Sequence, residues 1–192
     1  MAFLTEDAVA ALGFAHIGRD VRISDKASIY RAERISIADH ARIDDFCILS
    51  AGQGGIAVGR YVHIACYCSL IGDARIEFED FSGLSSRVAV YSSSDDFSGG
   101  ALAHPTVPED LRRVSSAPVV LRRHALVGAG SVILPGVTLG EGSSVGALSL
   151  VRNDLDAFWV YAGIPARKLR RRKTDLLALE AEALRREGAN TR

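Results

Sequence analysis

A run of cations near the C-terminal end of the sequence is suited to holding a phosphate group. Residues 167–173 read Arg-Lys-Leu-Arg-Arg-Arg-Lys. Arginine suits a phosphate because its forked guanidinium donors can bind two oxygens at once. The run is short and lacks interleaved aromatic residues, so it does not indicate a nucleic-acid surface. The alternative is that these residues are the solvated, basic start of a helix and hold no ligand.

Side chains that could move a proton are few. The chain has five histidines, and an acidic pair, Asp95-Asp96, ends a stretch rich in serine. An aspartate is a poor base for a hydroxyl unless its pKa is raised, and it is better suited to orienting a histidine or holding a protonated amine. The alternative is that the pair simply forms a turn.

The spacing of aliphatic residues indicates how these side chains are positioned. An aliphatic residue returns every six positions, and four positions later a small or β-branched residue follows in most cases, as at Cys47 and Cys68. This period fits neither an α-helix nor an ordinary strand. It fits a coil with three flat faces, in which each hexad forms one short strand and one corner, and stacked coils pair their strands in parallel. The longest unbroken series is Leu121, Val127, Ile133, Leu139, Val145 and Val151.

Eighteen hexads predict an all-β fold, a parallel β-helix over residues 17–156. Residues 96–118 carry no hexad, and a loop of this length in a repeat protein usually has a function. Residues 1–16 predict a short lead-in helix with Thr5 as N-cap. Residues 157–192 form a C-terminal segment with an amphipathic α-helix, whose apolar side we expect to hold Leu176, Leu177, Leu179 and Leu184. We expect six coils, at about 17–36, 37–57, 58–77, 78–96, 121–138 and 139–156.

Composition excludes several classes of function. Lys plus Arg equals Asp plus Glu at 23 each, so no global charge steers nucleic acid or membrane. We expect no signal peptide at the N-terminus, no membrane span and no disulfide framework from three cysteines, which together favour a cytoplasmic location. Cys66-x-Cys68 suggests a metal, but Cys68 lies at an inward position where cysteine acts as a small hydrophobe. We therefore expect no metal.

Two segments resemble the hexapeptide-repeat acyltransferases. Residues 128–140, Gly-Ala-Gly-Ser-Val-Ile-Leu-Pro-Gly-Val-Thr-Leu-Gly, look like the last hexads of that family, and 161–168, Tyr-Ala-Gly-Ile-Pro-Ala-Arg-Lys, like the segment that follows them. The likeness is to galactoside and maltose acetyltransferases and to acetyltransferases of nucleotide-linked sugars in surface-polysaccharide synthesis. It implies a left-handed β-helix, acetyl-CoA as donor, a sugar or nucleotide-sugar acceptor, and a homotrimer with active sites between subunits. The acceptor sugar, the choice between O- and N-acetylation and the acyl chain length stay open.

The resemblance also assigns positions to the donor. The amides of Ala129 and Ala147 match those that face the pantetheine arm, and the residues matching those that hold the CoA phosphates are Arg152, Asn153, Arg167 and Arg170. The alternative for the two alanines is corner geometry, because any hexad favours a small residue there.

Several residues are candidates for the base. The position of the family's catalytic histidine is Asp95 in this chain, followed by Asp96. His63 matches a position that lines the acceptor site, and we favour it as the base, whereas an interface or surface histidine is the alternative. His104, in the long loop, is a further candidate. The departure at Asp95 favours an amine acceptor.

Two other functions compete with the enzyme. A non-catalytic β-helix scaffold would need neither the long loop nor the segment at 161–168. A β-helix carbonic anhydrase needs three histidines on zinc with two of them close together, and here only His104 and His124 lie within twenty residues of each other.

Overall fold

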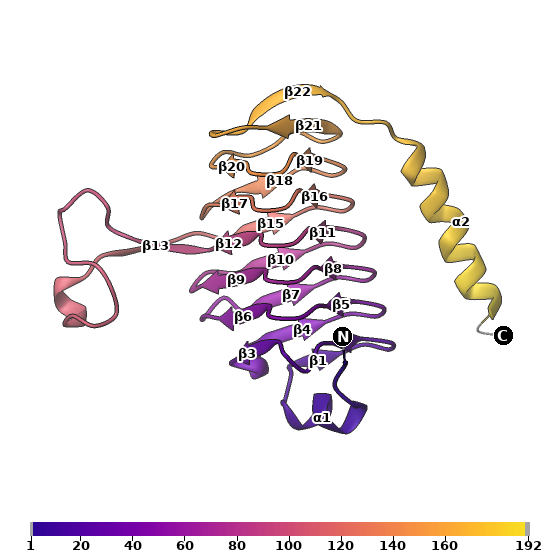
Figure 1. Ribbon diagram of the computed structural model, residues 1–192, viewed down its shortest axis with the longest axis horizontal. Coiled ribbons are helices and arrows are strands. Elements are labelled where there is room, and N and C mark those ends of the chain that lie inside the picture. The colour runs from indigo at the N-terminus through magenta and orange to yellow at the C-terminus, as the bar shows by residue number, and fades with distance from the viewer. Residues whose placement is uncertain (1, 191–192) are drawn as a thin grey trace.

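The computed structural model describes residues 2–190 and shows a column of stacked coils, in which each complete coil gives one short strand to each of three parallel sheets (Figure 1). Sheet 1 contains β1 (His16–Ile17), β4 (Ile35–Ile37), β7 (Ile56–Val58), β10 (Ile76–Phe78), β15 (Val119–Leu121) and β18 (Thr138–Leu139). Sheet 2 contains β2 (Arg22–Ile23), β5 (Arg42–Ile43), β8 (His63–Ile64), β11 (Gly83–Leu84), β16 (Leu126–Val127), β19 (Ser144–Val145), β21 (Trp159–Ala162) and β22 (Arg167–Arg171). Sheet 3 contains β3 (Ser28–Tyr30), β6 (Ile48–Ala51), β9 (Ser69–Gly72), β12 (Ala89–Tyr91), β17 (Val132–Ile133) and β20 (Leu150–Val151).

The coil count agrees with the repeat. Strands β1 to β12 and β15 to β20 form six complete coils, and a partial seventh follows, because Leu155 bridges Leu139 and β21 pairs in parallel with β19. The expected fold, a left-handed parallel β-helix with a C-terminal α-helix, is confirmed. The basic run does not start that helix; most of it forms β22, which pairs antiparallel with β21.

Strict register stacks each hexad position on its equivalent in the next coil. Ile43 pairs with Ile64, and Leu84 lies between Ile64 and Val127 in the same sheet; all four side chains are at most 2% exposed. Fully burying an aliphatic side chain of this size stabilises the fold by about 1.5–3 kcal/mol. Cys47 and Cys68 are buried at the inward small-residue position that the repeat predicts.

The three edges of the column need left-handed backbone turns. Between sheets 1 and 2, at what we term the 1–2 edge, corner residues with positive φ also stack their rings. Centroid distances are 4.7 Å for His40 and Tyr61, 4.8 Å for Tyr61 and Phe81, and 5.3 Å for Phe81 and His124. The stacked rings link coils that are consecutive in the column.

Two helices flank the column. Helix α1 (Glu6–Ala11) is N-capped by Thr5, whose hydroxyl accepts a hydrogen bond from the Ala8 amide at 3.3 Å, and a short 3₁₀ turn covers Ala32–Arg34. Helix α2 (Asp175–Asn190) runs back along the column toward its N-terminal end (Figure 1).

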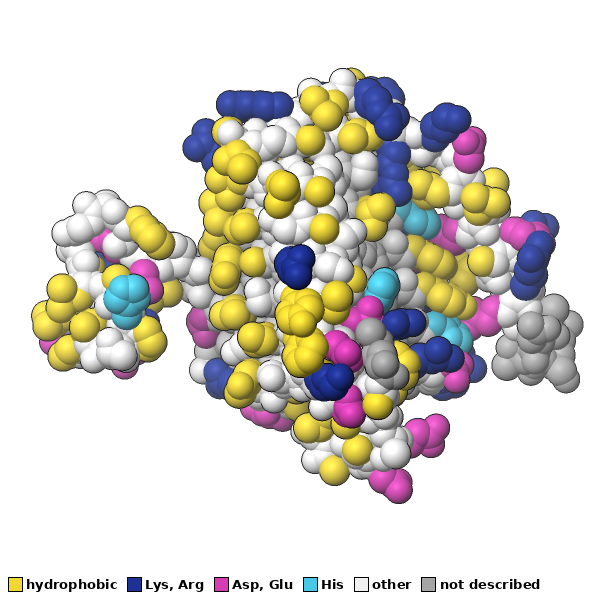
Figure 2. Space-filling model, viewed as in Figure 1, with side chains coloured by type: hydrophobic (Ala, Val, Ile, Leu, Met, Phe, Trp, Pro, Cys, Tyr) yellow, Lys and Arg dark blue, Asp and Glu magenta, His cyan; other side chains and the backbone are white. Residues whose placement is uncertain are grey.

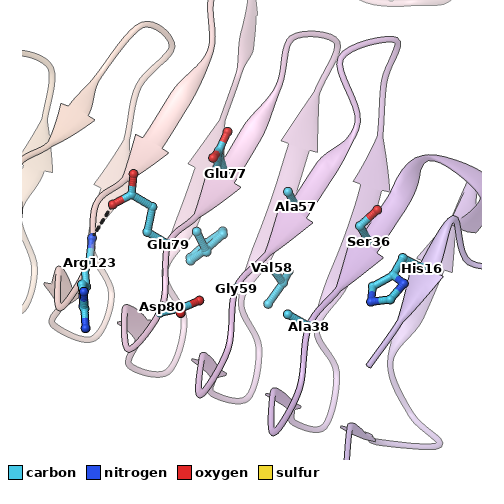
Figure 3. Close-up of a pocket in the computed structure, with 11 residues that line it drawn as sticks. His16, Ser36, Ala38, Ala57, Val58, Gly59, Glu77, Glu79, Asp80 and Arg123 are labelled. Carbon is cyan, nitrogen blue, oxygen red and sulfur yellow. Dashed lines mark hydrogen bonds between the residues drawn. The ribbon is translucent and has the colours of Figure 1, made fainter. Parts of the chain in front are cut away.

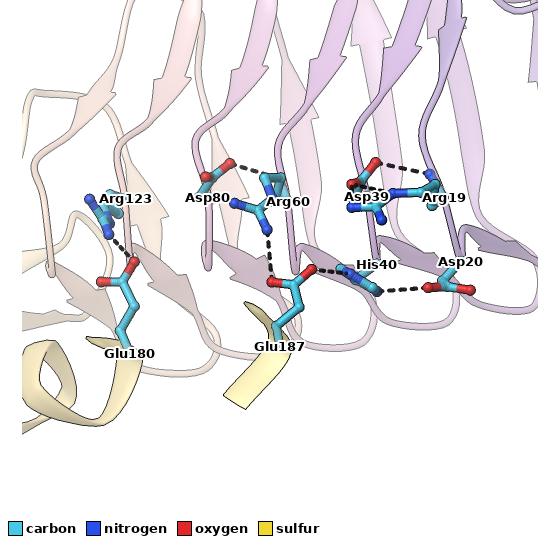
Figure 4. Close-up of polar contacts among 9 residues, drawn as sticks. All are labelled: Arg19, Asp20, Asp39, His40, Arg60, Asp80, Arg123, Glu180 and Glu187. Carbon is cyan, nitrogen blue, oxygen red and sulfur yellow. Dashed lines mark hydrogen bonds and ion pairs between the residues drawn. The ribbon is translucent and has the colours of Figure 1, made fainter. Parts of the chain in front are cut away.

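The expected apolar side of α2 is partly wrong. Leu177 and Leu179 are exposed, whereas Glu180 is buried against the 1–2 edge. There Glu180 pairs with Arg123 and with His124. Figure 4 shows the pair of Glu180 with Arg123 and the pairs of Glu187 with His40 and Arg60. The helix is held by carboxylates facing cations and rings, which leucine periodicity does not reveal.

The segment without hexads forms an arm that projects between β12 and β15, from the edge between sheets 3 and 1, which we term the 3–1 edge (Figure 1). Its base is an antiparallel pair of β13 (Ser93–Asp95) and β14 (Val114–Ser116), and its outer part holds a 3₁₀ turn at Glu109–Leu111. Phe97 on the arm is 93% exposed. Among the described residues, no helix is long and apolar enough to cross a bilayer.

Candidate functional site

A cleft of about 270 Å³ opens at the edge between sheets 2 and 3, the 2–3 edge. Gly83 forms its floor because it pairs in register with His63 on one side and Leu126 on the other, and it has no side chain to fill the space between them. Ser85 and Ser86, which follow β11, line the same cleft. We refer to this space as the edge cleft.

The edge cleft has a histidine held by a buried carboxylate. The Nε2 atom of His63 lies 2.8 Å from Oδ2 of Asp44, and the Nε of Arg42 donates to Oδ1 of the same carboxylate at 2.7 Å. Burial alone would raise the pKa of Asp44, but hydrogen bonds from Arg42 and His63 lower it below its usual value. The carboxylate is therefore ionised at neutral pH and acts as an acceptor for both partners.

Backbone donors line the 2–3 edge beyond the cleft. The N–H groups of Ser86, Ala129 and Ala147 have no hydrogen-bond acceptor within residues 2–190. The corresponding N–H groups of Arg19 and Arg60 on the 1–2 edge are bonded to carboxylates, at 2.9 and 2.7 Å. These three unpaired N–H groups follow one another along the edge. They can donate hydrogen bonds to a ligand arm that contains amides and to a developing oxyanion.

The acidic pair lies on the arm. One oxygen of Asp95 accepts the amide of His104 at 3.3 Å, and the other lies 3.9 Å from Arg112. The Asp96 carboxylate accepts the amide of Ser98 at 2.7 Å, and hydrogen bonds from Ser98 lower its pKa. A lowered pKa makes Asp96 a weaker base. Its hydrogen bond with the Ser98 amide fits the turn-forming alternative.

Cations gather at the C-terminal end of the 3–1 edge. Arg152, Asn153 and Arg167 line one pocket of about 300 Å³ together with Lys168. Arg170 does not line this pocket, although it is exposed on β22, where it pairs in register with Val160. The pocket has the charge and the forked donors that a phosphate needs.

The structure brings some expected residues together and separates others. His63, Ala129 and Ala147 share the 2–3 edge, whereas Asp95 and Arg152 belong to the 3–1 edge of the same chain. Sheet 3 lies between these two edges, so one chain does not unite them.

Sequence reasoning missed Asp44, Ser85 and Ser86. Register was the signal for Asp44, because β5 stacks directly on β8.

A larger hollow on sheet 1, of about 430 Å³, is less suited to chemistry (Figure 3). Its carboxylates already have partners in the chain. Glu79 accepts the Arg123 amide at 2.9 Å, as Figure 3 shows, and Glu77 accepts from Arg75 at 2.8 Å. Within the described residues, no group of three or more His, Cys, Asp or Glu side chains is placed to hold a metal ion.

Known proteins resemble this chain over nearly its whole length. A dTDP-4-amino-4,6-dideoxy-D-glucose acyltransferase from Escherichia coli is 45% identical over 94% of this chain and 94% of its own. The Escherichia coli K12 protein WbbJ, a putative lipopolysaccharide biosynthesis O-acetyl transferase, is 29% identical over 78% of this chain and 74% of its own. No protein-family model matches the chain.

A solved structure shares both sequence and fold. AntD, an N-acyltransferase from Bacillus cereus, has been solved with dTDP and coenzyme A; it is 44% identical, has a TM-score of 0.92, and aligns with 96% of this chain and 99% of its own. The likeness therefore extends over the coils, the arm and the C-terminal region.

Proposed function

The chain belongs to the hexapeptide-repeat acyltransferases, and we propose that it transfers an acyl group from CoA to the amine of a dTDP-linked 4-amino-4,6-dideoxy sugar. The 45% identity to an acyltransferase of that name is the observation that carries the proposal. The AntD structures also include complexes with the same aminosugar nucleotide and with 3-hydroxybutyryl-CoA. An amine acceptor agrees with the expectation drawn from Asp95.

A homotrimer is part of the proposal. Sheet 3 has the most apolar outer face of the three sheets. The outward residues of sheet 1 include His16, Ser36 and Glu77, and those of sheet 2 include Arg42 and His63. Hydrophobic side chains follow the column on the side from which the arm projects (Figure 2). The outward apolar residues of sheet 3 are Tyr30, Ile48, Ile71, Ala89, Tyr91, Val132 and Leu150, and Leu134 directly follows β17.

Placing sheet 3 toward a threefold axis completes the site. The 2–3 edge of one subunit then lies against the 3–1 edge of the next. This brings His63 and Ala129 of one copy toward Asp95 and Arg152 of another, which are on separate edges within one chain. The arm, with its exposed Phe97, would reach across to the neighbour.

The site residues then have distinct roles. The cations Arg152, Asn153 and Arg167 hold CoA phosphates, with Arg170 as an outlying partner. The amides of Ala129 and Ala147 bind the pantetheine arm, and that of Ser86 meets the thioester oxygen as it gains charge. His63 accepts the proton that the amine loses, and Asp95 holds the amine.

The relative supports Asp95 and the serines of the edge cleft. Solved variants of AntD carry substitutions at one aspartate and at one serine ten positions earlier. In this chain Ser85 precedes Asp95, and Ser86 precedes Asp96, by the same ten positions.

The free cysteines support the proposed compartment, and the proposed product supports the place in a pathway. Cys47, Cys66 and Cys68 are all free thiols, which fits a reducing cytoplasm. An acylated dTDP-sugar is an activated donor for a glycosyl transfer, so we place the reaction before a step of surface-polysaccharide assembly such as lipopolysaccharide synthesis.

The test is a direct assay. Purified protein is incubated with acetyl-CoA and dTDP-4-amino-4,6-dideoxyglucose, and free thiol and the mass of the sugar nucleotide are followed. We expect thiol release that depends on the sugar, and a product heavier by one acetyl group. The same assay with 3-hydroxybutyryl-CoA establishes the chain length of the donor. Absence of turnover with either donor, in a folded protein, would overturn the proposed acceptor and revive the scaffold alternative.

A further inference from the structure

Asp44 is an unusual carboxylate for the surface of a coil. Its side chain is only 9% exposed, yet both of its oxygens are used, one by Arg42 at 2.7 Å and the other by His63 at 2.8 Å. Burying a charge is costly unless hydrogen bonds compensate it. The contact between Asp44 and His63 therefore has a defined geometry, because Arg42 holds the other oxygen of the same carboxylate.

The carboxylate determines which ring nitrogen of the imidazole carries the proton. An ionised carboxylate only accepts hydrogen bonds, so the Nε2 of His63 must carry a proton. In the neutral ring Nδ1 is then the atom with a free lone pair, and it has no hydrogen-bond partner among the described residues. The His63 side chain is 52% exposed and lines the edge cleft beside Ser85 and Ser86.

Arg42 is itself restrained. Its guanidinium carbon lies 5.3 Å from the centre of the Phe3 ring, in the segment that precedes α1. Register places Arg42 beside His63 on neighbouring strands β5 and β8. A side chain anchored on two sides limits the positions that the Asp44 carboxylate can adopt, and through it the rotation of an otherwise exposed imidazole.

We infer that Asp44, held by Arg42, is a positioning residue that directs Nδ1 of His63 to accept the proton of the acceptor amine. The inference rests on the proposed function and adds two residues to it. As the amine nitrogen forms its bond to the thioester carbon, its proton passes to Nδ1. The carbon–sulfur bond then breaks, and the proton is returned to the CoA thiolate, so that amide and free thiol are the only products.

The first test needs no substitution. The protein is labelled with ¹⁵N-histidine, and the ring nitrogens of His63 are assigned by their loss in His63→Gln. We expect the neutral ring to be the Nε2–H tautomer, with a slowly exchanging proton. A substantial Nδ1–H population would overturn the inference, whatever the enzyme's substrate proves to be.

The second test separates positioning from folding. In Asp44→Asn we expect kcat to fall about tenfold to a hundredfold, with KM for both substrates nearly unchanged, because orientation and not binding is lost. The His63 tautomers should become mixed in the same variant. Asp44→Glu, which keeps the charge, should recover part of kcat.

A matched control is the neighbouring carboxylate. Asp45 interacts with Ser24 and Lys26 instead of the histidine, so Asp45→Asn removes the same charge without touching the ring. We expect normal kcat and tautomers. Equal losses of kcat in the two variants, or an unchanged kcat in Asp44→Asn, would overturn the inference. If the wild type turns over no dTDP-aminosugar, the proposed function fails separately.

Discussion

Polar side chains on this β-helix meet in pairs that neighbouring coils contribute. His63 and Asp44 lie nineteen positions apart in sequence, yet their side chains meet because β5 and β8 stack in register. Histidine at neutral pH is suited to taking a proton from an amine, and a carboxylate fixes which nitrogen does so. The chemistry proposed for the edge cleft therefore depends on contacts between coils and not on one hexad.

The first prediction concerns the base. We expect His63→Ala to lower kcat about a hundredfold or more, because general-base catalysis usually contributes that much. Steady-state kinetics with saturating acyl-CoA measures it. Unchanged turnover in a folded variant would remove His63 from the role, and Asp95→Asn would then be the variant to measure.

The second prediction concerns pH. The pKa of Asp44 is lower in the folded protein, so its ionised form contributes stability that is full above the unfolded pKa and is lost as pH falls through the folded value. We expect Asp44→Asn to be less stable than wild type by about 1–3 kcal/mol near pH 7. Urea denaturation at decreasing pH should show this difference shrinking as the pH falls below the ordinary pKa of an aspartate. A constant difference would contradict the argument.

At the scale of elements, α2 is held mainly by carboxylates. Glu180 is 7% exposed and contacts Arg123 and the buried His124, and Arg172 donates to the carbonyl of His124 at 2.8 Å just before the helix. Figure 4 shows Glu187 reaching between His40 and Arg60 one coil apart. The helix therefore spans several coils of the 1–2 edge.

The third prediction tests this attachment. In the double variant Glu180→Ala with Glu187→Ala we expect the helix to detach, with a lower Tm and faster tryptic cleavage at Arg185 and Arg186. Each 1 kcal/mol lost should lower Tm by about 2–4 °C in a chain of this size. Glu182→Ala is the control, because Glu182 pairs only with Arg185 and Arg186 of the same helix among the described contacts. Equal cleavage in both variants would show that these pairs do not hold α2.

At the scale of the whole molecule, the two halves of the proposed site lie on different edges of one column. The fourth prediction follows from the apolar outer face of sheet 3. Leu134→Asp should dissociate the proposed trimer and abolish turnover, because a charge would be buried between its subunits. Val120→Asp on sheet 1 is the control and should leave the trimer intact. Light scattering measures both, and a wild-type monomer at micromolar concentration would contradict the trimer.

The fifth prediction uses mixed subunits. We expect His63→Ala and Asp95→Asn each to be inactive alone. Mixing the two variants tests whether one site draws these two residues from two copies of the chain. Unfolding and refolding a mixture should restore part of the activity, because some mixed trimers contain one site with both native residues. No recovery, from variants that each refold as trimers, would place both residues in the same chain's site.

The sequence alone determined the architecture. A six-residue repeat leaves few solutions, because buried aliphatic residues such as Ile64 and Val127 must face one interior and small residues such as Cys68 must fit its corners. The assignment of Ala129 and Ala147 to the donor came from the family resemblance and stays a prediction. Periodicity is a local property of the chain, and so it can be recognised without coordinates.

Only the tertiary structure decided which polar side chains meet. The Asp44 carboxylate, the cleft above Gly83 and the glutamates of α2 depend on contacts between coils or between a helix and an edge, which composition does not encode. Asp96 is the exception, because the hydrogen bonds that lower its pKa come from Ser98, two residues away, in the turn that the sequence offered as an alternative. Hydrogen bonds and ion pairs need correct distances and directions, and folding alone supplies them.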